Sequence, residues 1–361
     1  MFNLFQISDP HFGKKFSNTK ESRLYSGLNI HDFRLCEALH NFFHEDVGDL
    51  DGISDDDQFF LIMNGDLTSK GHELEFQVAN TFLHSEHAIT GQGRVQMVGL
   101  KQPVTADDGR DLYAGIPGNH DHGNGWWNWP AVLGYSPEIY RRLLDAPPFS
   151  KQTWCSDSLE LCIFGIDSCS MYEEKTLNLA PWASGGFSKK HRTDFRSFLE
   201  KELSKPLIGG CEFRTAAILC HHPWTSEGSA GPLCPSCVAW LHGLAWDCGI
   251  RIVMTGHTHR SLTQVLESVG PHGKKRVREV RCPTTLQTPA VLTAEYQSPG
   301  LWWHRVRVEN REIVWEGTLL LYSGSSFAIP ETVTKPDDGK SNSGKPVREI
   351  WYRETMPSMG G

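Results

Sequence analysis

The sequence predicts an α/β fold, because short apolar runs alternate with segments of helical periodicity along most of the chain. The runs that we expect to form strands lie at 4–7, 59–63, 112–116, 161–164, 216–219 and 250–254. Apolar residues recur at helical spacing between them, around 30–44, 189–204 and 236–248. Gly249 supplies a C-terminal stop for the last of these helices.

From 263 to 329 the helical signal disappears, and short apolar segments separated by turns predict further strands. We interpret them as closing strands of the same domain, so that one domain covers 1–329 with its motifs in 1–262. The stretch after Pro330 is polar and rich in turn residues, and we expect 330–361 to form a flexible tail.

Composition excludes several classes of protein. The chain has 361 residues, of which 39% are hydrophobic and 22% charged, which argues against disorder, collagen and coiled coil. Its net charge of −8 argues against a protein that coats nucleic acid or binds membranes through a polybasic surface. Nucleic acid stays possible as a partner, but the charge gives no indication of it. No stretch resembles a signal peptide or a membrane span, and we expect a cytoplasmic protein without membrane contact.

The ten cysteines are predicted to be mostly reduced and buried. Cys162 and Cys220, for example, stand inside apolar runs, where a free thiol behaves as a small hydrophobic group. Cys234 and Cys237 form the one CxxC pair, which alone cannot complete a four-ligand zinc site.

Five of the predicted strands are followed at once by residue types that bind metals. These residues are Asp9 and His11, Asp66, Asn119 and His120, His221 and His222, and His257 and His259. One such cluster means little, since most histidines are ordinary core or surface residues. Five in succession are harder to explain in that way, because ligands in open α/β sheets gather beyond the carboxyl ends of the strands.

The donor types favour a particular chemistry. Two aspartates, one asparagine and four imidazoles make a nitrogen and oxygen set without thiolate, which suits Mn, Fe or Zn. Seven ligands are too many for one tetrahedral ion. They can serve two divalent ions if one carboxylate bridges them.

The motifs Asp-x-His, Gly-Asp, Gly-Asn-His-Asp, His-x-Pro and Gly-His-x-His resemble those of the calcineurin-like metallophosphoesterases over residues 1–262. The segments Ser8–Gly13 and Gly65–Gly71 look most like the bacterial cyclic-nucleotide-type phosphodiesterase branch. The resemblance implies a four-layer αββα sandwich, in which two mixed sheets are flanked by helices.

It also implies roles for individual residues. Asp9, His11 and His259 would hold the first metal, Asp66 would bridge, Asn119, His221 and His257 would hold the second, and His120 would face the substrate phosphate. His222 fills the variable position of His-x-Pro and is expected beside the ligands, where it could also touch substrate.

The function that follows is hydrolysis of a phosphate ester by in-line attack of a metal-bridging hydroxide. We expect a small phosphodiester, such as a cyclic nucleotide, and assign His120 to transition-state stabilisation or to protonation of the leaving oxygen. A phosphomonoesterase, a nucleotide pyrophosphatase or a nuclease could use the same motifs. A non-catalytic scaffold is a further alternative.

Two segments could shape the substrate site. Residues 91–110 carry few helix signals and are interpreted as an insertion that could form a wall of the cleft. Trp126 and Trp127 follow the Gly-Asn-His-Asp motif and could stack on a substrate ring, or pack as a lid on their own domain. The sequence leaves the oligomeric state open.

Overall fold

The structure, a computed structural model, describes most of the chain. The described residues are 1–13, 32–53, 58–69, 71, 73–85, 87–89, 96–100, 112–122, 149–169, 185–225, 231–270, 273–287, 298–330 and 351–359. Trp126 and Trp127, and most of 91–110, lie outside these ranges.

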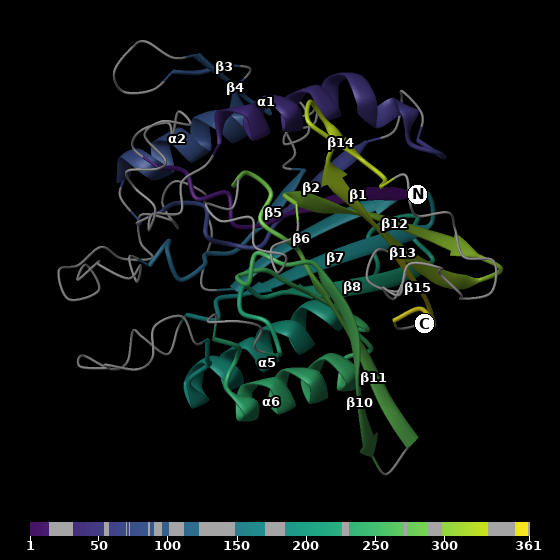
Figure 1. The fold of residues 1–361 in the computed structure, drawn as a ribbon. Helices are drawn as coiled ribbons and strands as arrows, with labels where there is room; N and C mark the ends of the chain where they lie inside the picture. The colour runs from purple at the N-terminus through teal and green to yellow at the C-terminus, as the bar shows by residue number, and fades with distance from the viewer. Residues whose placement is uncertain are drawn as a thin grey trace, which may run out of the picture.

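Two mixed β-sheets form the centre of the fold (Figure 1). The first has the order β14-β13-β12-β1-β2-β5, and β15 also pairs with β13. Its strands are β1 (Phe2–Ile7), β2 (Phe59–Met63), β5 (Tyr113–Gly115), β12 (Gly300–Glu309), β13 (Glu312–Tyr322), β14 (Phe327–Ala328) and β15 (Trp351–Met356). The pairs β1–β2 and β2–β5 are parallel, whereas β12 runs antiparallel to β1.

The second sheet has the order β10-β11-β9-β8-β7-β6. Its strands are β6 (Phe149–Ser156), β7 (Leu159–Ile166), β8 (Phe213–Leu219), β9 (Ile252–Thr255), β10 (Leu262–Gly270) and β11 (Gly273–Arg281). The four central strands are parallel and the two edge strands are antiparallel to their neighbours. A separate small ribbon pairs β3 (His87–Ile89) with β4 (Gln96–Val98).

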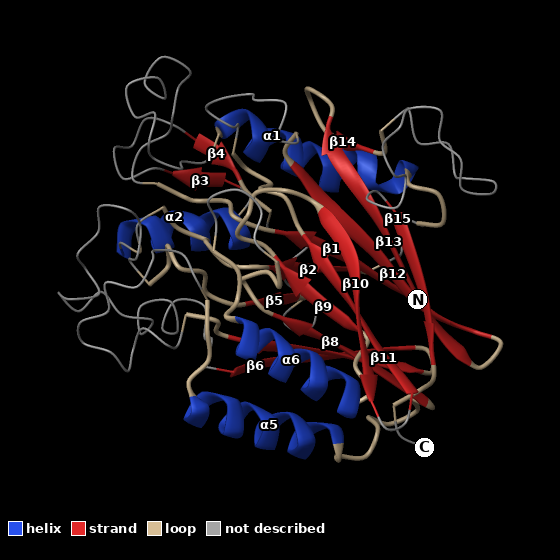
Figure 2. Ribbon diagram, turned by 60° about the horizontal axis from the view of Figure 1, so that its bottom comes forward, coloured by secondary structure: helices blue, strands red, loops and turns tan. Residues whose placement is uncertain are grey.

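Helices cover the outer faces of both sheets (Figure 2). On the first sheet lie α1 (Phe33–Asn41), which continues into a π turn and a 3₁₀ turn to Asp49, and α2 (Glu73–His84). On the second lie α5 (Lys189–Leu203) and α6 (Pro235–Asp247). The side chains of Asp32 and Ser188 cap α1 and α5 by accepting hydrogen bonds from backbone N–H groups of the first turn.

Three apolar clusters fill the spaces between these layers. One lies between α1, α2 and the first sheet, one between the two sheets, and one between the second sheet and α5 and α6. The middle cluster includes Trp302, which is fully buried, and Trp303 is buried in the first. This helix–sheet–sheet–helix order confirms the four-layer α/β prediction.

The structure also differs from several expectations. Helix α2 and strand β6 were not predicted, and the segment interpreted as an insertion, 91–110, contains β4. Within the expected tail, Trp351–Met356 forms β15, because its alternate side chains Tyr352 and Met356 are buried between the sheets. Cys234 and Cys237 are joined by a disulfide, whereas the other eight cysteines are free.

None of the helices in the described part of the chain has both the length and the apolar character needed to cross a membrane.

Candidate metal centre

Loops from both sheets meet where the parallel strands end. After β1 and β2, Asp9 N–H donates to the carbonyl of Gly65 at 3.2 Å, and His11 N–H donates to that of Asp66 at 3.0 Å. After β8 and β9, Gly256 N–H donates to the carbonyl of His221 at 2.9 Å. Backbone hydrogen bonds therefore join four of the five clusters predicted from the sequence in two pairs, one pair within each sheet.

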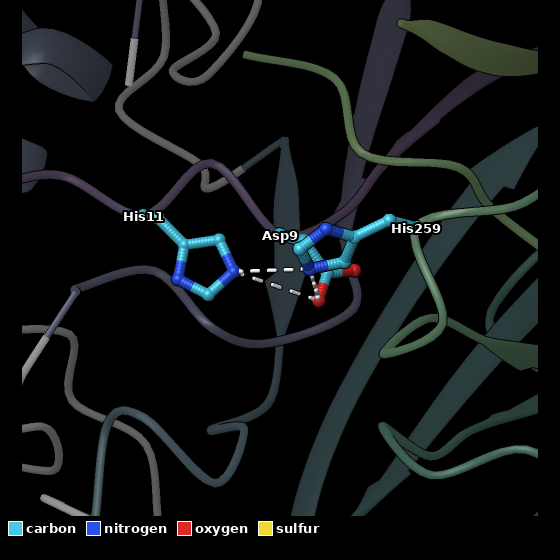
Figure 3. Close-up of side chains that lie close together, drawn as sticks. All are labelled: Asp9, His11 and His259. Carbon is cyan, nitrogen blue, oxygen red and sulfur yellow. Dashed lines mark hydrogen bonds and ion pairs between the residues drawn. The ribbon is translucent and has the colours of Figure 1, made fainter. Parts of the chain in front are cut away.

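The first group of donor atoms comprises Asp9, His11 and His259 (Figure 3). His259 Nε2 lies 3.3 Å from His11 Nε2 and 3.4 Å from Asp9 Oδ1, and His11 Nε2 lies 3.9 Å from that oxygen. The other carboxylate oxygen of Asp9 accepts hydrogen bonds from Ser8 Oγ and from the N–H of His257. Oδ1 is the buried oxygen that faces His259.

The second group comprises Asp66, Asn119, His221 and His257, with His221 at its centre. His221 Nε2 lies 3.3 Å from Asp66 Oδ2, 3.2 Å from Asn119 Oδ1 and 3.2 Å from His257 Nδ1. Atoms bound to one ion at about 2.1 Å lie roughly 3.0–3.4 Å from each other in octahedral or tetrahedral geometry. The spacing of this group therefore suits a shared metal ion.

Asp66 connects the two groups through a single oxygen. Its Oδ2 faces His221 Nε2 and also lies 3.8 Å from His11 Nε2 in the first group. Its Oδ1 accepts a hydrogen bond of 2.8 Å from the N–H of His120, which fixes the carboxylate in this orientation. The position is the one expected for a bridging ligand.

The electrostatics of the second group favour a bound cation. His221 Nδ1 donates to the carbonyl of Asn64 at 2.6 Å, so in the neutral ring Nε2 carries a lone pair that faces other acceptors. Burial opposes protonation here, but Asp66 and Asp9 outweigh it and raise the pKa of His221 to about 9. The surroundings thus attract positive charge, which a metal ion can supply as well as a proton.

The other donors remain available for a metal. Burial, and then the charge of neighbouring histidines, lowers the pKa of His257 to about 3 and that of His11 well below its usual value. Burial opposes ionisation of Asp9, but the hydrogen bond and charge of His259 hold the pKa of this carboxyl at about 2. Neutral imidazoles and ionised carboxylates are the forms that bind metals.

Five of the seven candidate ligands have left-handed backbone conformations, which non-glycine residues rarely adopt. The residues are Asp9, His11, Asp66, His257 and His259, with φ between 50° and 71°. Such strain concentrates at functional sites, where the surrounding structure holds it in place.

Glycines allow the loops to approach each other closely. A Cβ added at Gly118 would lie 2.3 Å from the backbone nitrogen of Asp66, and one at Gly65 would lie 2.7 Å from His221 Nδ1. Close packing therefore excludes a side chain at Gly118, and at Gly65 a left-handed backbone with φ +88° adds to the close packing.

His120 lies beside the seven candidate ligands, and with His11 and Asp66 it forms a further group of donor atoms that could hold a metal ion. Its Nδ1 donates to the carbonyl of Ser69 at 2.8 Å, and its ring lies 4.6 Å from that of His11. It is half-buried, whereas His11 is fully buried. One ring nitrogen is thus held by the backbone beside the ligands.

His222 is fully buried, with Nδ1 2.8 Å from Ser168 Oγ and its ring 4.5 Å from that of His257. This supports its expected place beside the ligands and gives it no exposed surface for a substrate. Trp126 and Trp127 lie outside the described residues, so stacking remains a prediction.

Sequence reasoning gave no role to two further groups at the site. Asp121 accepts four hydrogen bonds that join the loops after β2 and β5. His122 Nε2 lies 2.9 Å from Asp167 Oδ2, with Cys169 close by and all three buried. Asp167 follows β7 directly, so the strand-end rule would have found it.

Comparisons with known proteins are distant. No protein-family model matches the chain, and no curated protein matches it. Among solved structures, a proposed 5′-nucleotidase from Staphylococcus aureus aligns with 93% of this chain at 14% identity and a TM-score of 0.44. The chain spans 56% of the length of that structure.

Vps29 from Chaetomium thermophilum aligns with 99% of this chain and 97% of its own at 10% identity, with a TM-score of 0.29. At these scores neither likeness bears on activity. The function has to be inferred from the site itself.

Proposed function

We propose that this protein is a dinuclear metal-dependent phosphoesterase that hydrolyses a small phosphodiester. The observation that carries the proposal is the shared position of Asp66 Oδ2, which faces donor atoms of both groups. Two separate groups of ligands joined by one carboxylate oxygen are the arrangement that a pair of divalent ions requires.

The residues fit such a pair in number and in chemistry. Asp9, His11 and His259 with Asp66 offer four donors to one ion. Asn119, His221 and His257 with Asp66 offer four to the other. The nitrogen and oxygen donors suit Mn, Fe or Zn. When bound, such ions lower the pKa of a coordinated water and neutralise charge on a phosphate.

His120 is the residue we propose for contact with the substrate. Because Ser69 fixes Nδ1, the ring is oriented before substrate binds, and Nε2 can donate to or accept from a phosphate oxygen. Asp66 accepts from the backbone of the same residue, so ligand and proposed catalytic group are held in one loop contact. This supports a role in stabilising charge or protonating the leaving oxygen.

A substrate panel tests the proposal. The Mn²⁺-loaded protein is given an aryl phosphomonoester, an aryl phosphodiester, cyclic nucleotides and single-stranded DNA. We expect hydrolysis of the diester and of a cyclic nucleotide, and loss of both activities in Asp66→Asn. Activity on the monoester alone would contradict the diester preference. No activity on any substrate with two Mn²⁺ bound would contradict the proposed function.

A further inference from the structure

A continuous set of buried polar side chains runs along the inner face of the first sheet, within the apolar layer between the two sheets, and ends at the candidate metal centre. Tyr352, His304, Gln6 and Asn64 come from β15, from β12, from β1 and from the residue directly after β2. Each is at most 3% exposed. A buried polar group is costly unless it is hydrogen-bonded, so these side chains call for an explanation.

Backbone carbonyls fix the direction of every hydrogen bond in this set. Asn64 Nδ2 faces the carbonyls of Met254 and Cys220, at 2.9 and 3.4 Å, so it must be the donor end of the amide. Gln6 Nε2 faces the carbonyl of Thr255 at 3.2 Å and is a donor for the same reason. It also donates to Asn64 Oδ1 at 2.7 Å.

The tautomer of His304 then follows. Gln6 Oε1 lies 3.0 Å from His304 Nε2, which must carry the proton. His304 Nδ1 is therefore an acceptor, and the hydroxyl of Tyr352 donates to it at 2.7 Å. Burial lowers the pKa of His304 to about 3, which agrees with a neutral ring. Every donor from Tyr352 to Asn64 points the same way, the arrangement in which hydrogen bonds strengthen one another.

Asn64 connects this chain to three ligands of the second group. Its own carbonyl accepts from His221 Nδ1 at 2.6 Å, and Asp66 follows two residues later. The carbonyls to which its side chain donates belong to Cys220, directly before His221, and to Met254, three residues before His257. One amide thus joins the ends of β2, β8 and β9.

We propose that the chain Tyr352–His304–Gln6–Asn64 is a positioning relay that sets the geometry of the second metal site, so that the C-terminal strand helps to determine how tightly that metal binds. The relay rests on the dinuclear site proposed above. Two of the ligands that it reaches, His221 and His257, belong to the second site alone, whereas the first site is connected through the shared Asp66 and the backbone bonds of Gly65 and Asp66 to Asp9 and His11. The relay should therefore act more strongly on the second metal than on the first.

The test is a Mn²⁺ titration followed by electron paramagnetic resonance on the full chain. Asn119→Ala and His259→Ala, which each remove a ligand of one site, assign the two binding steps. Asn64→Leu should weaken the second step by about 10- to 100-fold, as is usual for groups that orient a ligand. Gln6→Met should have a similar effect, and Tyr352→Phe, at the far end, about fivefold.

Two controls separate positioning from general stability. Asn3→Leu removes a buried asparagine of β1 outside the relay, whose Oδ1 accepts from Trp303 Nε1, and should leave both Mn²⁺ affinities within about twofold. In the Gln6→Met background, Tyr352→Phe should have no further effect on the second step, because the chain is already interrupted.

Equal weakening of both steps, or an unchanged second step in Gln6→Met and Tyr352→Phe, would overturn the relay. Tyr352→Phe removes one hydroxyl only and keeps the test usable if Gln6→Met does not fold. A wild-type protein that binds two Mn²⁺ but hydrolyses nothing would contradict the proposed function and leave the relay to be judged on affinity. A wild-type protein with fewer than two sites would overturn both.

Discussion

Asp121 is the residue whose replacement gives the most quantitative test of how the site is built. Its Oδ2 accepts from the N–H groups of Gly118 and Leu67 at 2.9 and 3.0 Å, and its Oδ1 accepts from Thr68 N–H and Oγ1 at 2.8 and 2.9 Å. The carboxylate is buried and joins the loop that carries Asp66 to the loop that carries Asn119.

Asp121→Asn keeps the shape but leaves one acceptor oxygen for four donors. The orientation of the new amide with the lowest free-energy cost places its NH₂ group beside Thr68, because the Thr68 hydroxyl can rotate and accept a hydrogen bond from it. The N–H of Thr68 then loses its acceptor, at a cost of about 1–3 kcal/mol. The bonds from Gly118 and Leu67 lose their charged acceptor, at about 1 kcal/mol each. Together these losses come to about 4 kcal/mol, but the neutral amide also escapes the burial and the charge of Asp66 that raise the pKa of Asp121, which returns up to about 3 kcal/mol. The expected net loss is about 1–4 kcal/mol, or about 1–5 °C in Tm for a chain of this length.

The measurement is thermal unfolding by circular dichroism at pH 8. Burial and the charge of Asp66 raise the pKa of Asp121 to about 6, so the carboxyl is ionised there. Asp157→Asn, at a side chain that is 83% exposed, is the matched control and should shift the Tm by less than about 1 °C. If Asp121→Asn and Asp157→Asn unfold at the same temperature, the four hydrogen bonds do not hold the loops as argued.

Three further predictions concern the metals and the proposed catalytic group. Asn119→Ala and His259→Ala should each reduce bound Mn²⁺ from two ions per chain to one by elemental analysis, and retention of both ions would contradict the ligand assignment. His120→Ala should lower kcat by about 10²- to 10⁴-fold in the phosphodiester assay. Loss of an ion from this variant would show that His120 is a ligand instead. Chelation of the metals should lower the Tm, since free metal at a thousand times its Kd contributes about 4 kcal/mol per site; an unchanged Tm in excess chelator would speak against metals bound to the folded state.

The sequence was informative where function depends on local pattern. Each of the five clusters directly follows an apolar run, and the strand-end rule applies to one chain segment at a time. It therefore brought Asp9 and His259 into one predicted site although 250 residues separate them. Helix α2 was missed despite an apolar stripe from Phe76 to Leu83, whereas β15 could not have been recognised, because its pairing with β13 defines it.

Residues that act through long-range hydrogen bonds left no such pattern. Gln6 lies in an apolar run, where the pattern predicts only a single polar residue within a strand. Its role depends on His304 and Asn64, which lie 298 and 58 positions away in the sequence. Asp121 belongs to a quoted motif, but the donors it accepts from become visible only when the loops are folded together.

The strained ligands show that the geometry of the centre depends on hydrogen bonds of the surrounding fold. A left-handed conformation costs about 1–2 kcal/mol for a residue with a side chain, so five of them cost roughly 5–10 kcal/mol, as much as the net stability of many domains. Interactions that need no ion offset this cost: Asp9 N–H bonds Gly65, His11 N–H bonds Asp66, and Asn64 ties the strand ends together. In a site built this way, a distant change such as Tyr352→Phe can alter metal affinity only through the hydrogen bonds that connect it to a ligand.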